Sequence, residues 1–306
     1  MKLKSLALSL GVVALFCMST AFAQTYNFQT VNYPDDQFTQ LLGINNSGDI
    51  AGYHGASVNQ GFTYTAGAFT SENYPGSVQT QVIGINNRPF KTSGFYIDKK
   101  GDTFGFTDYQ GTFTSVSFPK DVPCTQCSPT PFNQLLSQND YGQAAGYLSK
   151  NKTNTDPDIP YVYDEQGGVF EVYEIPGAVG GAQATGINNS DNTCGFYIDS
   201  AGVSHGWLQV QGHITLLNYP NSTGTSASGL NNSGQVVGFW TDSSSNTHGF
   251  VYNISAATFA SVDDPSGVGE TIVNGINDDG TLVGFYGSSA CTGVSTCNGF
   301  IATPTE

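Results

Sequence analysis

The stretch Gly43-Ile44-Asn45-Asn46-Ser47-Gly48-Asp49-Ile50-Ala51-Gly52-Tyr53 is the first copy of a phrase that recurs along the chain. The later copies begin at Gly84, Ser137, Gly186, Gly229 and Gly275, which places successive copies 41 to 53 residues apart. Repeats of about 40–50 residues with strand-like texture are typical of propeller blades. The repeat therefore predicts the architecture of the chain before any single residue is considered.

One copy contains enough signals to predict four short strands. Residues 39–45, 49–53, 61–64 and 69–74 alternate in the manner of strands, and they are separated by turn residues. Asn46-Ser47-Gly48 is a turn, because Asn can bond its own backbone and Gly accepts a positive φ. Pro75 ends the fourth strand at an outer edge, where a missing donor costs little. Four antiparallel strands of this kind form a blade.

The copies agree at positions that a propeller constrains. A glycine precedes the asparagine by two residues in every copy except the one with Ser137, and we expect it where first strands crowd at the axis. The asparagines that end the first strands are Asn45, Asn86, Asn139, Asn188, Asn231 and Asn277. A Gly-aromatic pair such as Gly61-Phe62 puts a ring on the third strand, which we expect to lie between blades.

The sixth copy lacks its fourth strand, because it stops at Gly299-Phe300-Ile301-Ala302. The missing strand lies at the other end of the chain, where residues 27–34 match residues 112–119. We therefore predict an all-β chain with a single domain, residues 24–306, that forms a six-bladed β-propeller. Its N-terminal strand completes the last blade, which removes a free sheet edge.

Residues 1–23 have the pattern of a secretory signal peptide. Lys2 and Lys4 give a positive start, an apolar run follows to Phe16, and Ala21-Phe22-Ala23 is a small-x-small cleavage pattern. We expect a secreted protein, extracellular or periplasmic. No later segment reaches 18 apolar residues, so no membrane insertion is expected.

The charge of the chain disfavours one class of partner. The whole chain carries a net charge of −15, and without Lys2 and Lys4 it becomes −17. Nucleic acid binding depends on Lys and Arg neutralising phosphates, so we expect no nucleic acid partner. Solubility explains this charge, and attraction of cations is the sharper alternative.

Export permits disulfides, and the cysteines suggest where they form. Cys124 and Cys127 are near neighbours in one loop, and Cys291 and Cys297 in another, so each pair could clip its own loop. Cys194 is left over in a strand, where we expect a buried free thiol. The Cys124/Cys127 pair could also suggest a redox centre or half of a zinc site, but the sequence lacks the context of either.

The full phrase Gly-Ile-Asn-Asn-x-Gly-x-Ile/Val-x-Gly-Tyr/Phe, then His-Gly-Phe and Phe-Thr-x-x-x-x-Pro, resembles the bacterial extracellular repeat family called HAF. The resemblance covers nearly all of residues 26–302 and is best from Asn231 to Phe250. It is weakest over 134–177, where Ser137 replaces Gly and Pro160-Tyr161 replaces the Gly-aromatic pair. The resemblance implies secretion and a tandem-repeat fold. It brings no established activity, so no catalytic residue is carried over.

Three long insertions indicate a binding face. They occupy residues 120–132, 148–160 and 287–298, the first before a first strand and the others between second and third strands. Strand direction places all three on one face, and insertions gathered on one face of a repeat protein mark the expected binding face.

The predicted binding face is also acidic. The candidate binding residues are Asp98, Asp199, Asp242, Asp121, Asp156 and Asp158. The first three recur at equivalent positions after the second strand, and ordinary turn chemistry explains them. The sharper alternative is that these carboxylates bind Ca²⁺ or sugar hydroxyls.

No catalytic pattern stands out, since the chain has neither a Gly-x-Ser-x-Gly elbow nor a phosphate-binding loop. We expect a monomeric binding or scaffold protein without a cofactor, with calcium as a possibility, and with an extracellular glycan or protein as partner. The alternative is an extracellular propeller enzyme, a glycoside hydrolase or lyase, that uses two carboxylates on the same face. A purely structural role in an envelope or matrix is a third possibility.

Overall fold

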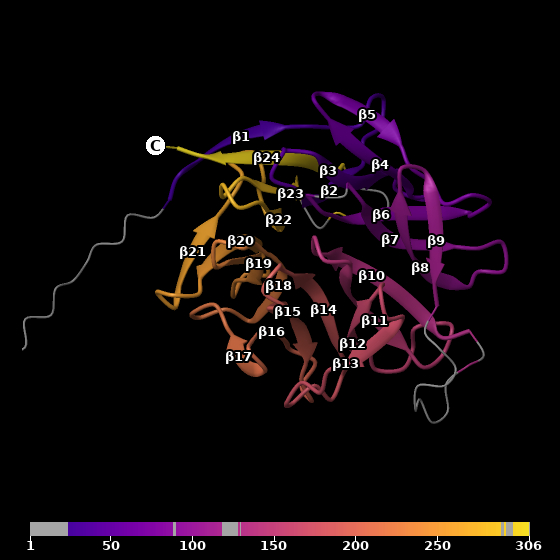
Figure 1. Cartoon of the computed structure of the whole chain (residues 1–306). Helices are drawn as coiled ribbons and strands as arrows, with labels where there is room; N and C mark the ends of the chain where they lie inside the picture. The colour runs from indigo at the N-terminus through magenta and orange to yellow at the C-terminus, as the bar shows by residue number, and fades with distance from the viewer. Residues whose placement is uncertain are drawn as a thin grey trace, which may run out of the picture.

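The computed structural model describes residues 24–87, 90–117, 128, 130–288, 291 and 296–305. Within these residues every regular element is a strand, and the strands form six four-stranded antiparallel units around one axis (Figure 1). The first strand of each unit lies nearest the middle of the ring, and the fourth lies at the outside. The predicted all-β six-bladed propeller is confirmed.

The strands follow the chain in order, four to a blade. Blades 1 and 2 contain β2 (Thr39–Ile44), β3 (Ile50–His54), β4 (Gln60–Thr65), β5 (Ala68–Ser71), β6 (Gln79–Ile85), β7 (Thr92–Ile97), β8 (Thr103–Tyr109) and β9 (Thr112–Val116). Blades 3 and 4 contain β10 (Phe132–Gln138), β11 (Gln143–Ser149), β12 (Ile159–Asp164), β13 (Val169–Val172), β14 (Ala182–Ile187), β15 (Thr193–Ile198), β16 (Ser204–Val210) and β17 (His213–Leu217). Blades 5 and 6 contain β18 (Gly224–Leu230), β19 (Gln235–Thr241), β20 (Thr247–Asn253), β21 (Thr258–Val262), β22 (Glu270–Ile276), β23 (Leu282–Gly287), β24 (Asn298–Pro304) and β1 (Tyr26–Thr30).

The N-terminal strand closes the ring. β1 pairs antiparallel with β24, and Phe28 lies opposite Ala302 in this register. The Phe28 ring also packs against Phe300, with 5.4 Å between the ring centroids. A single parallel bridge between Thr247 and Glu270 joins the sheets of blades 5 and 6. The predicted closure is therefore observed, and β24 has no free edge.

The repeat glycine lies where neighbouring first strands come closest. A side-chain carbon at Gly275 would lie 2.6 Å from the carbonyl oxygen of Leu42, and one at Gly229 would lie 2.8 Å from that of Asn274. Every first strand also has a β-bulge just before this position. The bulge re-aims the side chains that face the axis. Packing therefore favours glycine at this position, as the repeat predicted, and blade 3 accommodates the small Ser137 there.

The six repeat asparagines form a closed ring of hydrogen bonds around the axis. In each blade the side-chain amide donates to the backbone carbonyl of the equivalent asparagine in the next blade, over 2.9–3.5 Å. The last bond runs from Asn277 back to Asn45. The side-chain oxygen of each asparagine accepts at least one backbone N–H group of its own turn, and that of Asn188 accepts two. One side chain thus shapes a turn and joins two blades.

The residue after each of these asparagines forms a second closed ring. Its backbone N–H donates to the side-chain oxygen of the equivalent residue in the next blade, over 2.7–2.9 Å. The members are Asn46, Asn87, Asp140, Asn189, Asn232 and Asp278. The two aspartates lie three blades apart, and each accepts the side-chain amides of both neighbouring asparagines. We call this end of the axis the asparagine face, and the opposite end the cavity face.

Large aromatic residues fill the spaces between blades. The rings that follow the glycine of the third strand, with Tyr161 in blade 3, are fully buried: Phe62, Phe106, Tyr161, Trp207, Phe250 and Phe300. Toward the cavity face, a tyrosine before the repeat proline stacks on an aromatic ring of the next blade in three of the interfaces, those of Tyr33, Tyr74 and Tyr219. Tyr74 lies 3.6 Å from Tyr96 between ring centroids, and Tyr219 lies 4.1 Å from Trp240. The blades are thus joined by hydrogen bonds at the axis and by stacked rings farther out.

Deletion of residues 24–34 should remove β1 and expose the edge of β24. We expect aggregation or a lower melting temperature, because an unpaired strand edge invites pairing with other chains. Size-exclusion chromatography and thermal melting against the chain that begins at residue 24 test this. A deletion variant with unchanged melting would contradict it.

The substitution Asn188→Ala should destabilise the ring far more than Ser190→Ala in the same turn. Asn188 is only 6% exposed, and the change removes two turn hydrogen bonds and the bond to the carbonyl of Asn231. The loss of these three bonds should cost about 2–4 kcal/mol of unfolding free energy. Urea unfolding of both variants provides the measurement, and equal midpoints would argue against a ring that holds the blades.

Candidate functional site

The cavity face opens into an axial cavity of about 390 Å³. This volume lies within the range of about 300–1,000 Å³ that small-molecule sites have. The wall comes from the first strands of all six blades and from the second strands of blades 1 and 2. Its lining residues are Gln40, Leu42, Tyr53, Gln81, Ile83, Phe95, Gln134, Leu136, Thr185, Ser228 and Asn274.

The side chains at the bulged position of the first strands are large and apolar on one side of the cavity, and smaller and polar on the other. Blades 1 to 3 place Leu42, Ile83 and Leu136 at the bulged position of their first strands. The same position carries the smaller polar residues Thr185, Ser228 and Asn274 in blades 4 to 6. A ligand here would therefore meet apolar side chains together with the glutamines of blades 1 to 3 on one side, and small hydroxyl or amide side chains on the other.

Several polar groups of the wall have no partner within the described part of the chain. The Gln134 side chain and the Ser228 hydroxyl make no side-chain hydrogen bond there, although both residues line the cavity. The Gln81 side chain uses its amide hydrogen on Asn59, which leaves its oxygen available. An amide offers both donors and an acceptor, and a hydroxyl can act in either role. The cavity is thus equipped to bind neutral hydrogen-bonding groups.

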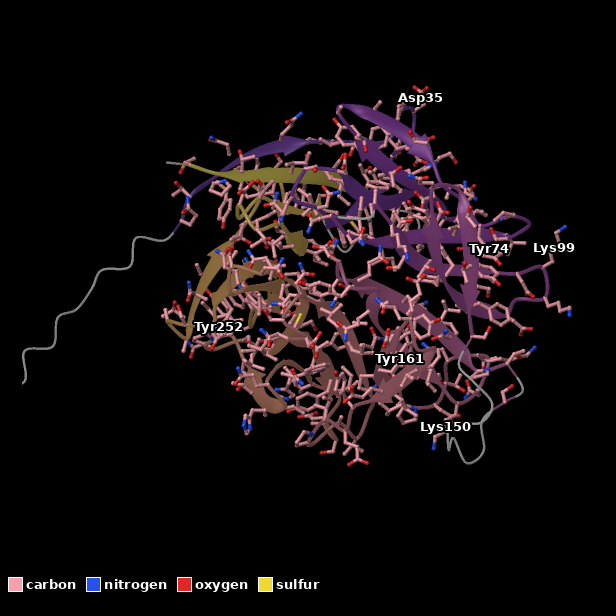
Figure 2. All side chains as sticks on the ribbon, in the orientation of Figure 1. Asp35, Tyr74, Lys99, Lys150, Tyr161 and Tyr252 are labelled. Carbon is pink, nitrogen blue, oxygen red and sulfur yellow. A yellow bond between two sulfur atoms is a disulfide. The ribbon has the colours of Figure 1, made fainter. Side chains whose placement is uncertain are left out.

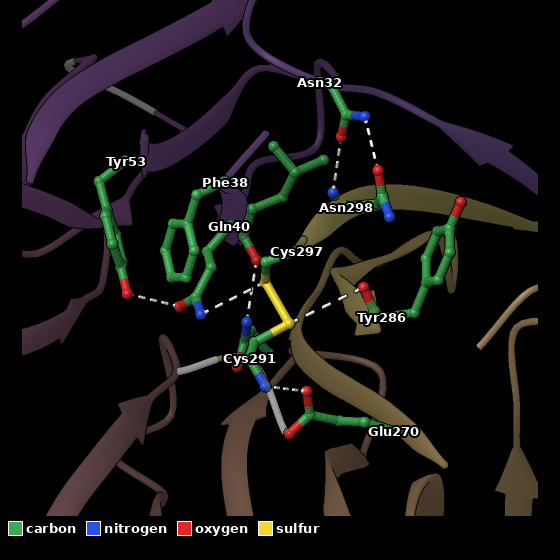
Figure 3. Close-up of a disulfide and its surroundings, with 12 residues drawn as sticks. Asn32, Phe38, Gln40, Tyr53, Glu270, Tyr286, Cys291, Cys297 and Asn298 are labelled. Carbon is green, nitrogen blue, oxygen red and sulfur yellow. Dashed lines mark hydrogen bonds between the residues drawn. A yellow bond between two sulfur atoms is a disulfide. The ribbon is translucent and has the colours of Figure 1, made fainter. Parts of the chain in front are cut away.

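A disulfide supports one side of this wall (Figure 3). Cys291 is bonded to Cys297, which joins two cysteines that we proposed as a pair. The Gln40 amide donates to the Cys297 sulfur over 3.7 Å, and the Gln40 oxygen accepts from the Tyr53 hydroxyl over 2.7 Å. Burial raises the pKa of Tyr53, so its hydroxyl keeps its proton. The disulfide therefore fixes the amide of a cavity residue.

The sequence also predicted the states of Cys194 and of the Cys124/Cys127 pair. Cys194 is a buried free thiol, as expected, and burial raises its pKa to about 12. Its unreactive setting fits a small core residue. Cys124 and Cys127 lie outside the described residues.

The cavity narrows along the axis toward the asparagine face. Below the wide mouth lies a narrower space of about 80 Å³, lined by the glycine positions of the first strands. A further space of about 60 Å³ lies among the two asparagine rings. The wide mouth thus leads to a channel too narrow for a large ligand, so a bound molecule would enter and leave on the cavity face.

The three recurrent aspartates each close their own turn. In Asp98, Asp199 and Asp242 one side-chain oxygen accepts the backbone N–H groups two and four residues later, over 2.7–3.0 Å. They belong to blades 2, 4 and 5, and the structure does not bring them together. Their turn role matches the explanation that the sequence favoured.

The pKa values of two of these carboxyls also bear on their chemistry. The backbone N–H of Val203, then His205, lowers the pKa of Asp199. The backbone and then the side chain of Asn246 lower the pKa of Asp242 to about 2. A general acid requires a raised pKa instead. These carboxyls therefore lack the property that the enzyme alternative needs.

The other predicted acidic residues occupy long loops. Asp156 lies in the exposed loop of blade 3, where its carbonyl accepts from Ser149. Asp158 is partly buried, its carboxylate accepts from Gln183 over 2.6 Å, and burial raises its pKa. Asp121 lies outside the described residues.

Two of the long insertions meet on the structure. The N–H of Ser128 donates to the carbonyl of Lys150, and that of Phe132 to the carbonyl of Asn151, so insertions 120–132 and 148–160 contact each other. Figure 2 shows Lys99 and Lys150 extending from the outer part of the molecule. Of insertion 287–298, residues 287, 288, 291 and 296–298 are described, and they carry the disulfide.

Neither a metal-ligand cluster nor a membrane-spanning helix is found in the described part of the chain. This part contains no group of three or more His, Cys, Asp and Glu residues arranged to hold a metal ion. No helix within it has the length and apolar character to cross a bilayer.

Sequence reasoning identified the cavity face but missed the residues of the cavity. The available signal was a glutamine three residues before the repeat glycine or its serine replacement in four successive copies, Gln40, Gln81, Gln134 and Gln183, of which the first three line the cavity. A glutamine on an otherwise apolar strand near an axis is a candidate for a ligand contact.

Neither a protein-family model nor a curated protein matches the chain. Solved structures share its fold at low identity. A triple arginine mutant of AofleA from Arthrobotrys oligospora has a TM-score of 0.51 at 12% identity, over 92% of this chain and 90% of that one. SapL1 lectin in complex with alpha methyl fucoside has 0.52 at 10%, over 81% and 88%. An Aleuria aurantia lectin mutant in complex with Fucalpha1-6GlcNAc has 0.50 at 9%, over 82% and 90%.

The low pKa of Asp242 should depend on the side chain of Asn246. We expect carboxyl NMR to place that pKa near 2 and Asn246→Ala to move it toward its ordinary value, because a hydrogen-bond donor to the charged form is lost. A lowered pKa stabilises the fold above the ordinary pKa, and this contribution is lost as pH falls through about 2. Ser244→Ala, which leaves the backbone donors, should change little. A pKa near 4 in the unmodified chain would contradict the turn geometry.

Proposed function

We propose that this chain is an exported binding protein whose axial cavity takes one end of a neutral glycan. The insertions at 120–132, 148–160 and 287–298, which the sequence predicts for the same face, would contact the rest of the glycan. The observation that carries the proposal is the lining of the axial cavity. It combines unpartnered amide and hydroxyl groups with aromatic and aliphatic side chains, and none of its residues is charged at neutral pH.

This lining fits the chemistry of a sugar. Sugar hydroxyl groups both donate and accept hydrogen bonds, which matches Gln134, Ser228 and the free oxygen of Gln81. The C–H faces of a sugar ring are apolar and would pack on Leu42, Leu136 or Phe95. A charged ligand would find no opposite charge in this wall, and burying an unpaired charge costs much free energy.

The alternatives to glycan binding are a protein partner and a propeller enzyme. A protein partner would rest on the long insertions, and the cavity would then stay filled with water. A glycoside hydrolase or lyase would need two carboxyl groups close to the bound sugar. The cavity wall holds none, and the aspartates of blades 4 and 5 have lowered pKa values. The binding hypothesis is therefore the one we favour.

The substitution Gln134→Ala tests the proposal. The chain from residue 24 is first applied to an array of neutral and acidic glycans, and the tightest binder is then titrated calorimetrically. Gln134→Ala should weaken binding about tenfold, because a hydrogen bond to the ligand is worth about 1–1.5 kcal/mol.

The matched control is Gln166→Ala. Gln166 is exposed on a turn of blade 3 at the other end of the molecule and does not line the cavity, so its loss should leave affinity unchanged. Binding of no glycan at all, or equal affinity of the two variants, would refute the cavity as a sugar site. Binding restricted to acidic glycans would contradict the neutral ligand.

A further inference from the structure

The interface between blades 1 and 2 differs from the other five at one buried position. Glu72 stands three residues before the repeat proline, at the end of the fourth strand. The equivalent residues in the other copies are Val31, Val116, Tyr173, Leu217 and Val262. Four of these are buried apolar side chains, with at most 6% exposed. One interface therefore has a carboxylate where the repeat places an apolar contact.

Two more polar residues of blade 2 stand opposite Glu72. Thr92 begins β7, and its direct cross-strand partner on β8 is Asp108. The Thr92 hydroxyl donates to the Glu72 carboxylate, which brings blades 1 and 2 together. Cross-strand partners place their side chains on one face of the sheet about 5 Å apart, so Asp108 shares the face that meets Glu72.

The residue pairs equivalent to Thr92 and Asp108 are uncharged in the other blades. The partners equivalent to Thr92 and Asp108 are Ile50 with Tyr64, Ala144 with Tyr163, Thr193 with Gln209, Val236 with Tyr252, and Leu282 with Ala302. None of these pairs contains a carboxylate. Two equivalent positions, those of Glu72 and Asp108, thus carry carboxylates in this interface alone, while the threonine between them recurs as Thr193 in blade 4.

The two carboxylates lack a positive partner among the described residues. Asp108 is 7% exposed, and one of its oxygens accepts the N–H of Gly111 over 3.2 Å. Its other oxygen is buried without a hydrogen-bond partner. Neither Glu72 nor Asp108 forms an ion pair within the described chain. Asp108 is buried and Glu72 is partly buried, and two neighbouring negative charges with little access to water are costly, so this arrangement calls for a positive occupant.

We propose that Glu72, Asp108 and the Thr92 hydroxyl form a site for a hard divalent cation, Ca²⁺, between blades 1 and 2. Calcium is bound by carboxylate and neutral oxygen atoms, which are the groups that these residues supply. With three side-chain ligands and water for the rest, the site should be weak, with a Kd of about 10⁻⁴–10⁻³ M. The cation would join a strand of blade 1 to two strands of blade 2.

A proton is the competing occupant. Burial raises the pKa of Glu72 to about 7, with the neighbouring charge of Asp108 also raising it, and burial raises the pKa of Asp108. A raised pKa in the folded state gives stability that is complete below the ordinary pKa and is lost as pH rises through about 7. Without a cation, the fold should therefore weaken between pH 5 and 8.

The experiment uses the chain from residue 24, freed of metal with a chelator and dialysed to pH 8. Addition of 5–10 mM CaCl₂, roughly tenfold above the expected Kd, should raise the melting temperature by about 2–5 °C. Calorimetry should give one weak site. Glu72→Gln should remove both responses, while Glu171→Gln, an exposed carboxylate on β13, should keep them.

Glu72→Val restores the residue type of the other interfaces and guards against a misfolded variant. It should melt higher than the unmodified chain in metal-free buffer at pH 8 and should not respond to calcium. If calcium neither binds nor shifts the melting of the unmodified chain, while its pH-dependent loss of stability disappears in Glu72→Gln, the occupant is a proton and the proposal is wrong. A calcium response that survives in Glu72→Gln would also overturn it.

Discussion

The closed contact of six first strands around one axis is the constraint on which the structure depends. Neighbouring first strands approach closely, so the repeat position holds glycine in five blades and the small Ser137 in blade 3, and each first strand bulges just before it. Backbone groups that end near the axis need partners because water has little access. The two asparagine rings supply them, since every blade donates to the next and the last donates to the first.

The two ends of the axis are therefore specialised in opposite ways. The asparagine face uses its polar side chains on one another, and the amide groups of the second ring are consumed by Asp140 and Asp278. On the cavity face, the side chain of Gln134 and the hydroxyl of Ser228 line the wall and make no side-chain hydrogen bond within the described part of the chain. A binding function belongs at the end where hydrogen-bonding capacity is left over.

The architecture was predictable from the sequence because the same pattern of strands and turns recurs in six copies. The blade count, the closure by residues 27–34 and the crowded glycine all follow from comparing the copies. The second asparagine ring did not, because Asn46 and Asp140 look like ordinary turn residues until the next blade is placed beside them. The cavity residues were missed for a related reason, since a single Gln134 on a strand does not reveal that it lines one cavity together with Gln40 and Gln81 of the two preceding blades. The charged contact at Glu72 could have been noticed by aligning the copies, but its partner Asp108 required the sheet register.

Closure by β1 has a consequence for how the chain is made. Phe28 pairs opposite Ala302, so the first strand to be synthesised must wait for almost the last one. At about 5–20 residues per second, this delay amounts to roughly 14–55 s of translation. During that time β1 has no partner strand with which to pair. Its alternation of aromatic and polar residues, Tyr26-Asn27-Phe28-Gln29-Thr30, keeps it too polar to collapse alone, and its five residues are short for an aggregating strand. The terminal strand is thus suited to remaining soluble until its partner is synthesised.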